Sequence, residues 1–180
     1  MIRNLITYEE ISSLARPCTT EQERAEAMIA EAQREDIRPR LGDALYIRLA
    51  YREKDKEAEP LPEQYATLLD GGLWEDRAGK PRLVQGLKTA LAYYTLARII
   101  RDGNIQATTY GSVVKDDEYS MDPERSERQR QYRELFAQAD GYMAEVEEYL
   151  AANCDKIQEY RAAAPCAKRA SRTSIRIIGK

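Results

Sequence analysis

No residue between Lys88 and Arg98 carries a charge, although 33% of the residues in the chain are Asp, Glu, Lys or Arg. This stretch lies inside the apolar segment 87–100, which is long enough for a helix that is apolar on nearly every face. A helix of that kind is normally the buried centre of a bundle. Other helices must then surround it, so the fold class that we predict is an all-α helical bundle.

A second pattern, closer to the C-terminus, predicts the longest helix of this bundle. Asp122-Pro123-Glu124 is a strong helix start, because Asp caps the helix end and Pro suits the first helical position. The apolar residues that follow recur at steps of three and one, as one face of a helix requires. They are Tyr132, Leu135, Phe136, Ala139, Tyr142, Met143, Val146, Tyr149 and Leu150. We expect a helix over about 122–153, packed on another helix of the same chain rather than on a second copy.

Short helices are predicted for the N-terminal part of the chain. The segments Thr7–Glu10 and Thr20–Glu23 both have the S/T-x-x-E form of a capping box, which starts a helix. The first helix should end before Pro17. The second should break at Arg38, because the residue before a proline is pushed out of the α region. Pro39 can then open the next helix.

Acidic and basic side chains alternate ahead of that proline. Glu31, Glu35 and Asp36 lie near one another on the second predicted helix, and Arg34 and Arg38 share their face. Opposite charges three and four residues apart stabilise a helix surface. We therefore interpret these residues as a salt-bridged, solvated face and not as a catalytic carboxylate pair.

Three segments connect or terminate the central helices. Residues 52–60 form a charged linker without a hydrophobic anchor. Pro62 opens a further helix, which Gly71-Gly72 should end because glycine adopts the backbone conformation of a helix C-cap. The segment 74–82 contains Gly79 and Pro81 and is interpreted as a loop or a small hairpin.

The segment of about 105–120 differs from its helical surroundings. It is rich in β-forming residues and flanked by turn formers, so we expect an extended loop or β-hairpin arm that projects from the helical body. We take six of its residues as candidate protein-interface residues: Thr108, Thr109, Tyr110, Val113, Val114 and Lys115.

The net charge of −3 hides an asymmetry between the body and the C-terminal end. Residues 162–180 carry five basic side chains and no acidic one, so this tail is +5 and the rest of the chain is −8. We treat 1–161 as one helical domain and 162–180 as a loosely ordered tail that has an acidic or strand-edge partner. The candidate interface residues of the tail are Lys168, Arg169, Arg172, Ile175, Arg176, Ile177 and Ile178.

Composition excludes several kinds of chemistry. The chain has no histidine, which removes the commonest general base and the commonest metal ligand. Its three cysteines form no CxxC pair and fit neither a disulfide framework nor a zinc site. We name no catalytic, cofactor-binding or metal-binding residue, and we expect neither a leader peptide nor a membrane span. The chain has 12 tyrosines against one Phe and one Trp, and tyrosine suits partly solvated contacts between surfaces because it combines an apolar ring with a polar hydroxyl.

Several strings of the sequence, taken in order, resemble one family of proteins. They are EAQREDIRPRLGDALY over 31–46, LDGG over 69–72, GLK over 86–88, ALAYY over 90–94, NIQ over 104–106 and YGSVVK over 110–115. Together they resemble the small helical head–tail connector (adaptor) proteins of tailed bacteriophages and prophages. The resemblance covers about residues 20–155, and the tail matches least.

The resemblance implies a structural protein and not an enzyme. Such connectors are small helical bundles that assemble as a ring, commonly of twelve copies, below the portal protein of the capsid. The ring continues the DNA channel, without sequence-specific DNA binding, and docks the next neck or tail protein. The implied location is the virion neck, after assembly in the cytoplasm of the host bacterium.

Two other classes of function stay open at this point. One is a regulatory or nucleic-acid-binding helical module that uses the basic tail, and salt-dependent DNA binding that is lost with residues 162–180 would favour it. The other is an enzyme of unidentified type, which would need a deep pocket with convergent, perturbed carboxylates or tyrosines.

Overall fold

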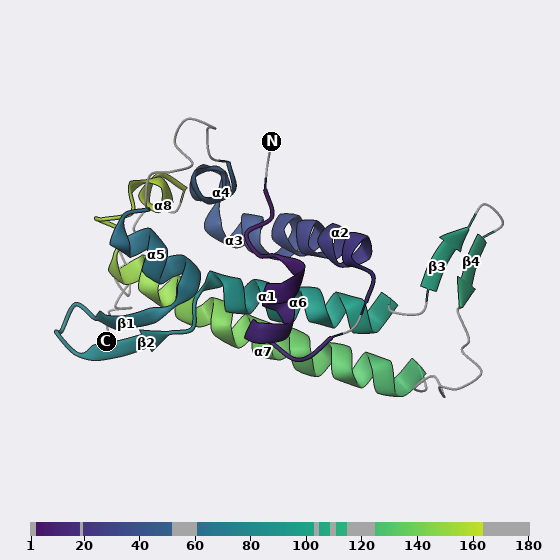
Figure 1. Ribbon diagram of the computed structural model, residues 1–180. Coiled ribbons are helices and arrows are strands. Elements are labelled where there is room, and N and C mark those ends of the chain that lie inside the picture. Colours follow the sequence, from purple (N-terminus) through teal and green to yellow (C-terminus); the bar gives the residue numbers. More distant parts are fainter. Residues whose placement is uncertain are drawn as a thin grey trace, which may run out of the picture.

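Figure 1 shows the computed structural model of the protein, in which the helices pack in layers and form an elongated body. The structure describes residues 3–18, 20–51, 61–102, 105–108, 111–114 and 125–163. For the strands within 105–114, for Arg125 and for 161–163 it describes the backbone alone. In these described ranges no helix is long and apolar enough to cross a membrane.

Two long helices form the centre of the molecule. Helix α6 (Leu87–Asp102) runs antiparallel to helix α7 (Arg125–Ala152) along most of its length. Ala90, Leu91 and Ala97 of α6 are fully buried, and α1, α2 and α5 also pack on this helix. The predictions of a buried central helix and of a long helix that packs on it within the chain are both confirmed.

The N-terminal helices confirm one predicted capping box and contradict the other. Helix α1 (Tyr8–Leu14) is capped by Thr7, whose hydroxyl accepts from the Glu10 amide while the Glu10 carboxylate accepts from the Thr7 amide. Helix α2 (Gln22–Ala32) begins instead with Glu21 as N-cap and has no side-chain cap. Thr20 therefore lies one residue too early for its hydroxyl to satisfy the first amides of the helix.

The predicted break at Arg38 is wrong. Helix α2 continues through a π-turn (η1, Gln33–Ile37) into helix α3 (Arg38–Leu41), and Arg38 has helical dihedrals. The Arg38 amide donates to the carbonyl of Gln33, five residues back. This wider turn makes room in the helix for the ring of Pro39, which lacks an amide hydrogen. The chain turns only at Gly42, where φ is +79°, and helix α4 (Asp43–Ala50) follows.

A short hairpin follows helix α5. Helix α5 (Glu63–Asp70) ends at Gly71, and strand β1 (Gly72–Glu75) then pairs antiparallel with β2 (Pro81–Val84). Of the two structures that we considered for the segment 74–82, the hairpin is the one observed. Helix α8 (Gln158–Ala163) packs on α4, so the first residues of the predicted tail are helical. The predicted linker 52–60 lies outside the described residues.

The predicted arm is present as a second hairpin. Strand β3 (Ile105–Thr108) pairs antiparallel with β4 (Gly111–Val114), and Thr108 is opposite Gly111. Figure 1 shows this hairpin beyond the neighbouring ends of α6 and α7, apart from the bundle. The fold class is thus a helical bundle with one long C-terminal helix and a β-hairpin arm. The predicted helix start at 122–124 lies outside the described residues, and α7 is described from Arg125.

Candidate interaction surfaces

The arm places three of its six candidate residues in paired strands. Thr108 ends β3, while Val113 and Val114 are the last residues of β4. Thr109, Tyr110 and Lys115 lie outside the described residues, as do all seven candidate residues of the tail. Among the described elements, β3 and β4 each pack closely only on the other. The arm is therefore a ribbon on which none of the described helices packs closely.

A partly buried polar network connects the two helices that carry the arm. Arg40 of α3 donates from Nη1 to the Tyr94 hydroxyl at 2.8 Å and to Asp140 Oδ1 at 2.7 Å. Its Nε donates to Glu147 at 2.7 Å. The Tyr94 hydroxyl in turn donates to Asp140 at 2.6 Å. Burial and this hydrogen bond raise the pKa of Tyr94. The network joins α3, α6 and α7, and so restricts the movement of the two helices that flank the arm relative to each other.

Replacing Tyr94 by Phe tests this network. The change removes one hydroxyl that donates to a carboxylate and accepts from a guanidinium, while Arg40 and Asp140 stay in contact. We expect the free energy of unfolding to fall by about 1.5 kcal/mol, measured by urea denaturation. Tyr51→Phe is the matched control because Tyr51 is exposed, and its effect should stay within about 0.5 kcal/mol. Equal effects of the two changes would mean that the Tyr94 hydroxyl adds nothing.

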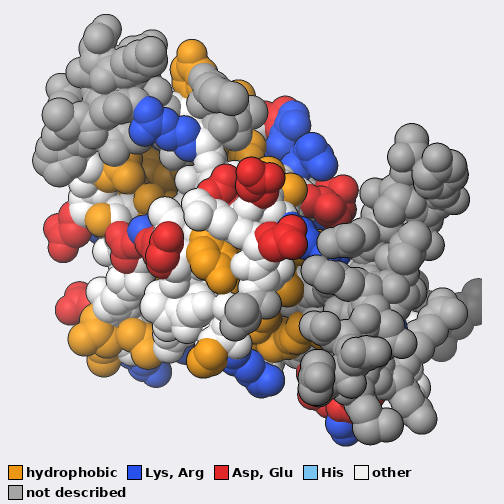
Figure 2. All heavy atoms as spheres, turned by 45° about the vertical axis from the view of Figure 1, so that its right-hand side comes forward, with side chains coloured by type: hydrophobic (Ala, Val, Ile, Leu, Met, Phe, Trp, Pro, Cys, Tyr) orange, Lys and Arg blue, Asp and Glu red, His pale blue; other side chains and the backbone are white. Residues whose placement is uncertain are grey.

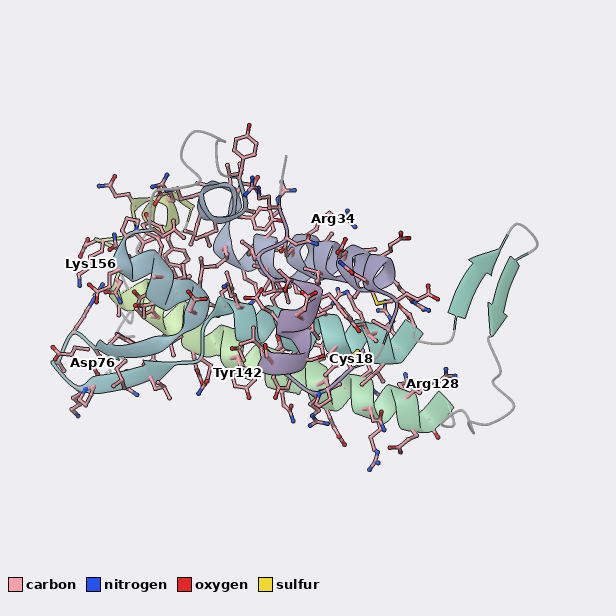
Figure 3. The ribbon with its side chains drawn as sticks, in the orientation of Figure 1. Cys18, Arg34, Asp76, Arg128, Tyr142 and Lys156 are labelled. Atoms are coloured by element: carbon pink, nitrogen blue, oxygen red, sulfur yellow. The ribbon has the colours of Figure 1, made fainter. Side chains whose placement is uncertain are left out.

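The acidic group on α2 and η1 is not the solvated face that we expected. Its partner is Arg98 of α6, whose side chain is only 5% exposed. Arg98 Nη1 lies 2.5 Å from Asp36, Nη2 lies 3.2 Å from Glu35, and Nε lies 3.2 Å from Glu31. The arginines of the same helix face elsewhere. Arg34 is exposed on the outer side of the bundle (Figure 3), and Arg38 pairs with Asp43.

One guanidinium thus serves three carboxylates at the α2–α6 contact. Burial raises the pKa of Asp36 even though Arg98 acts to lower it. In the described part of the chain no three His, Cys, Asp or Glu side chains are arranged to hold a metal ion. Sequence reasoning missed Arg98 as the partner. The available signal was a charge directly after the uncharged run 89–97 of a buried helix, because such a charge needs a counter-charge from another element.

The outer surface of the body is of mixed charge. On the face seen in Figure 2, acidic side chains gather across the middle, and Lys and Arg lie mostly toward the edges. Many of these charges are paired, for example Lys88 with Asp70 at 2.8 Å and Arg82 with Asp76 at 3.4 Å. The described residues on that face therefore form no broad basic patch.

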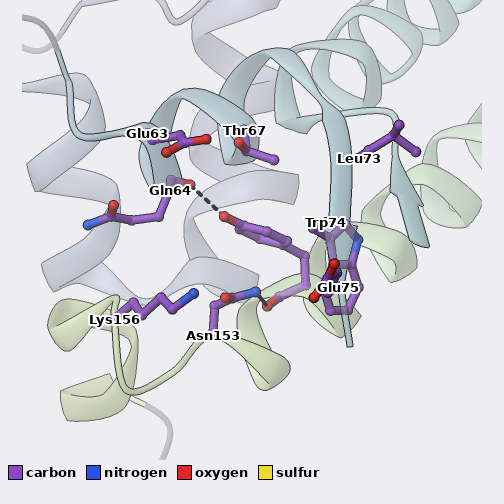
Figure 4. A pocket seen from close by; sticks show the side chains of 9 residues that line it. Glu63, Gln64, Thr67, Leu73, Trp74, Glu75, Asn153 and Lys156 are labelled. Carbon is purple, nitrogen blue, oxygen red and sulfur yellow. Dashed lines mark hydrogen bonds between the residues drawn. The ribbon is translucent and has the colours of Figure 1, made fainter. Parts of the chain in front are cut away.

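A small pocket lies beside the first hairpin, where α5, β1 and the C-terminal end of α7 meet (Figure 4). Its volume is about 240 Å³. The rings of Trp74 and Tyr149 form an edge-to-face pair, with centroids 5.4 Å apart. The Tyr149 hydroxyl donates to the carbonyl of Gln64 at 2.9 Å, and burial raises its pKa. The pocket is lined by Glu63, Gln64, Thr67, Leu73, Trp74, Glu75, Tyr149, Asn153 and Lys156.

An exposed apolar pair borders this pocket. Leu73 of β1 is 78% exposed, and Leu83, directly opposite on β2, is 57% exposed. Two leucines side by side on the outer face of a hairpin favour contact with another apolar segment. The sequence predicted neither the pocket nor this pair, because both depend on how the hairpin docks on α5 and α7.

Comparison with known proteins gives a family but no activity. The sequence profile of a family of unknown function, DUF6712, matches residues 37–170. No curated protein and no solved structure matched the chain. The match spans the described elements from the end of η1 to α8, including the arm and the pocket, and on that evidence the chain belongs to the DUF6712 family.

Proposed function

We propose that this protein is a structural head–tail connector of a tailed phage or prophage. The observation that carries the proposal is the β3–β4 arm, which the two longest helices hold beyond the bundle. A two-stranded ribbon is marginally stable alone in water. It gains stability when its open edges and faces are covered by a neighbouring subunit or by the next protein of an assembly.

Two further features support a role in assembly. The network of Arg40, Tyr94 and Asp140 joins the two helices that flank the arm, so a partner that binds there meets a pre-organised helix pair and less entropy is lost on binding. The sequence resemblance to connector proteins independently supports the same role. In that role the chain forms a ring, of twelve copies by analogy, between the portal protein and a neck or tail-completion protein.

The charge of the chain suits a ring around DNA. The body, without the tail, carries −8. Like charge on the wall of a channel keeps a passing phosphate backbone from sticking. In the proposed assembly DNA passes through the ring without sequence-specific contacts, and the basic tail contacts protein. A ring with Lys and Arg on its inner wall would contradict this part of the proposal.

Electron microscopy of the protein mixed with its cognate portal protein tests the function directly. We expect rings that cap the portal. Replacing residues 105–114 by a Gly/Ser linker of equal length should abolish portal binding and ring formation, while the melting temperature of the body stays within a few degrees, because the arm packs closely on no other described element. Arg130→Ala, which removes one exposed ion pair on α7, is the control and should assemble normally. Failure of the unaltered protein to bind the portal or form rings would overturn the proposal.

The alternative function, a nucleic-acid-binding module, predicts a different result. Neutralising the tail arginines would then abolish a salt-dependent affinity for duplex DNA. For a connector we expect weak DNA binding that these substitutions leave nearly unchanged. A fluorescence-anisotropy titration at two salt concentrations distinguishes the two functions.

A further inference from the structure

We propose that the pocket between α5, β1 and α7 is a docking site for the basic C-terminal tail, residues 164–180, of the same chain. The inference does not depend on the connector function, because it concerns the isolated protein. It rests on unpaired charges around the pocket, on the chemistry of its walls, and on the place where the tail leaves the body.

The first observation is that the acids of the pocket lack partners. Glu63 and Glu75 are exposed at its rim, and neither makes an ion pair with a described residue. The only cation of the lining is Lys156, so the lining has a net charge of −1. Other acids near the hairpin are paired, as Asp76 is with Arg82. A cation can therefore bind these two carboxylates without breaking an ion pair between described residues.

The second observation is that the walls suit an arginine side chain beside an aliphatic one. The ring of Trp74 is partly exposed and offers aromatic surface on which a guanidinium can stack, while the buried Tyr149 ring supports it edge-to-face. Leu73, which lines the same pocket, leaves most of its side chain in solvent. A peptide that carries both arginine and isoleucine would neutralise the acids and cover the leucine.

The tail has this composition. Residues 164–180 contain Arg169, Arg172 and Arg176 and no acidic residue, and Ile175 and Ile177 flank the last of these arginines. Charge and hydropathy of the tail are thus complementary to the pocket.

The tail also starts close to the pocket. It follows α8, and the Tyr65 hydroxyl of α5 donates to Glu159 of α8 at 2.6 Å. Glu63 and Gln64, on the same turn of α5 as Tyr65, line the pocket. Arg169 is six residues beyond Ala163, and an extended chain spans about 3.3–3.6 Å per residue, so roughly 20 Å is within its reach. A tethered segment of this length has a high effective concentration, which favours the tail of the same chain over that of another copy.

The single tryptophan of the chain makes the proposal measurable. Trp74 lines the pocket, so its emission reports occupancy. In the full-length protein at low salt we expect a blue-shifted maximum that moves to the red as salt releases the tail. The variant Arg169→Gln/Arg172→Gln/Arg176→Gln should lose this salt response. The variant Glu63→Gln/Glu75→Gln should lose the salt response as well, because it removes the negative charges of the pocket that attract the tail.

Matched controls separate docking from a general loss of charge. The variant Arg34→Gln/Arg130→Gln/Arg133→Gln removes three exposed arginines of the body, and Glu23→Gln/Glu26→Gln removes two exposed acids of α2. Both controls should keep the salt response of the unaltered protein. Circular dichroism of every variant checks that the helices are intact.

Two results would overturn the proposal. One is an emission maximum that does not respond to salt in the unaltered protein, or that responds equally in the tail variant. The other is a salt response that grows with protein concentration, since this would place the tail of a second copy in the pocket. Portal binding plays no part in either measurement, so failure here leaves the connector proposal standing, and the reverse also holds.

Discussion

Replacing Arg98 by Ala is expected to lower the free energy of unfolding by about 3 kcal/mol. The change takes the shared cation from Glu31, Glu35 and Asp36 and leaves Asp36, whose side chain is 12% exposed, largely buried without its partner. Removal of one partner of a buried ion pair typically costs about 3–5 kcal/mol. We expect the low end of that range because Glu35 is 53% exposed and keeps much of its hydration. Urea denaturation measures the loss.

Two control variants separate charge from packing. Arg98→Met keeps most of the buried stem and removes the guanidinium with its charge and its hydrogen bonds, so it should lose nearly as much stability as Arg98→Ala. Arg130→Ala removes an exposed ion pair with Glu127 and should cost at most about 0.5 kcal/mol. If Arg98→Met were as stable as the unaltered protein, the arginine would contribute through its apolar stem alone.

The pH dependence of the Arg98 variants follows from Asp36. Burial raises the pKa of this carboxyl in the folded protein, so between its ordinary and its raised pKa the folded state binds more protons than the unfolded state. The stability that this group contributes is therefore greatest at low pH and is lost as the pH rises through that window. Without Arg98 the pKa of Asp36 rises further. We expect the deficit of Arg98→Met to shrink when urea denaturation is repeated at about pH 5 instead of pH 7.

The sequence predicts well the elements whose pattern depends only on neighbouring residues. The uncharged run before Arg98 indicates α6, and the seam from Tyr132 to Leu150 indicates α7, because a helix repeats every 3.6 residues whatever it packs against. The arm is equally local, since β-forming residues lie between turn formers. None of these predictions requires knowledge of a distant residue.

The features that were missed depend on contacts between distant residues. Asp36 is 62 residues from Arg98 in the sequence, so spacing along the helix pointed to Arg34 and Arg38 instead. The π-turn at Gln33–Ile37 replaces the break expected before Pro39, and in this wider turn the Arg38 amide still donates to a carbonyl of the helix, that of Gln33. The Trp74–Tyr149 pocket exists only once the first hairpin has docked on α5 and α7.

Replacing Gly86 by Ala is the second change with a large expected effect. Gly86 joins the first hairpin to α6 with φ at +89°, a conformation that side-chain-bearing residues rarely adopt. A Cβ atom there would lie 2.5 Å from the Gly71 nitrogen and 2.6 Å from the Leu69 oxygen, both of which are backbone atoms. Strain and overpacking each cost about 1–3 kcal/mol, so we expect a loss of about 4 kcal/mol in the free energy of unfolding.

Substitutions at two other glycines separate the two contributions to this loss, backbone strain and steric overlap of the new Cβ atom. Gly79 has φ at +73° with nothing within 4 Å of a built Cβ, so Gly79→Ala should show the strain alone, about 1–2 kcal/mol. Gly141 lies exposed within α7 in open space, and Gly141→Ala should stabilise the protein by about 0.5–1 kcal/mol. Urea denaturation of the three variants should give this order. Equal losses for Gly86→Ala and Gly79→Ala would mean that the backbone at Gly71 moves aside, and that the first hairpin, with the pocket beside it, is not rigidly held against α5.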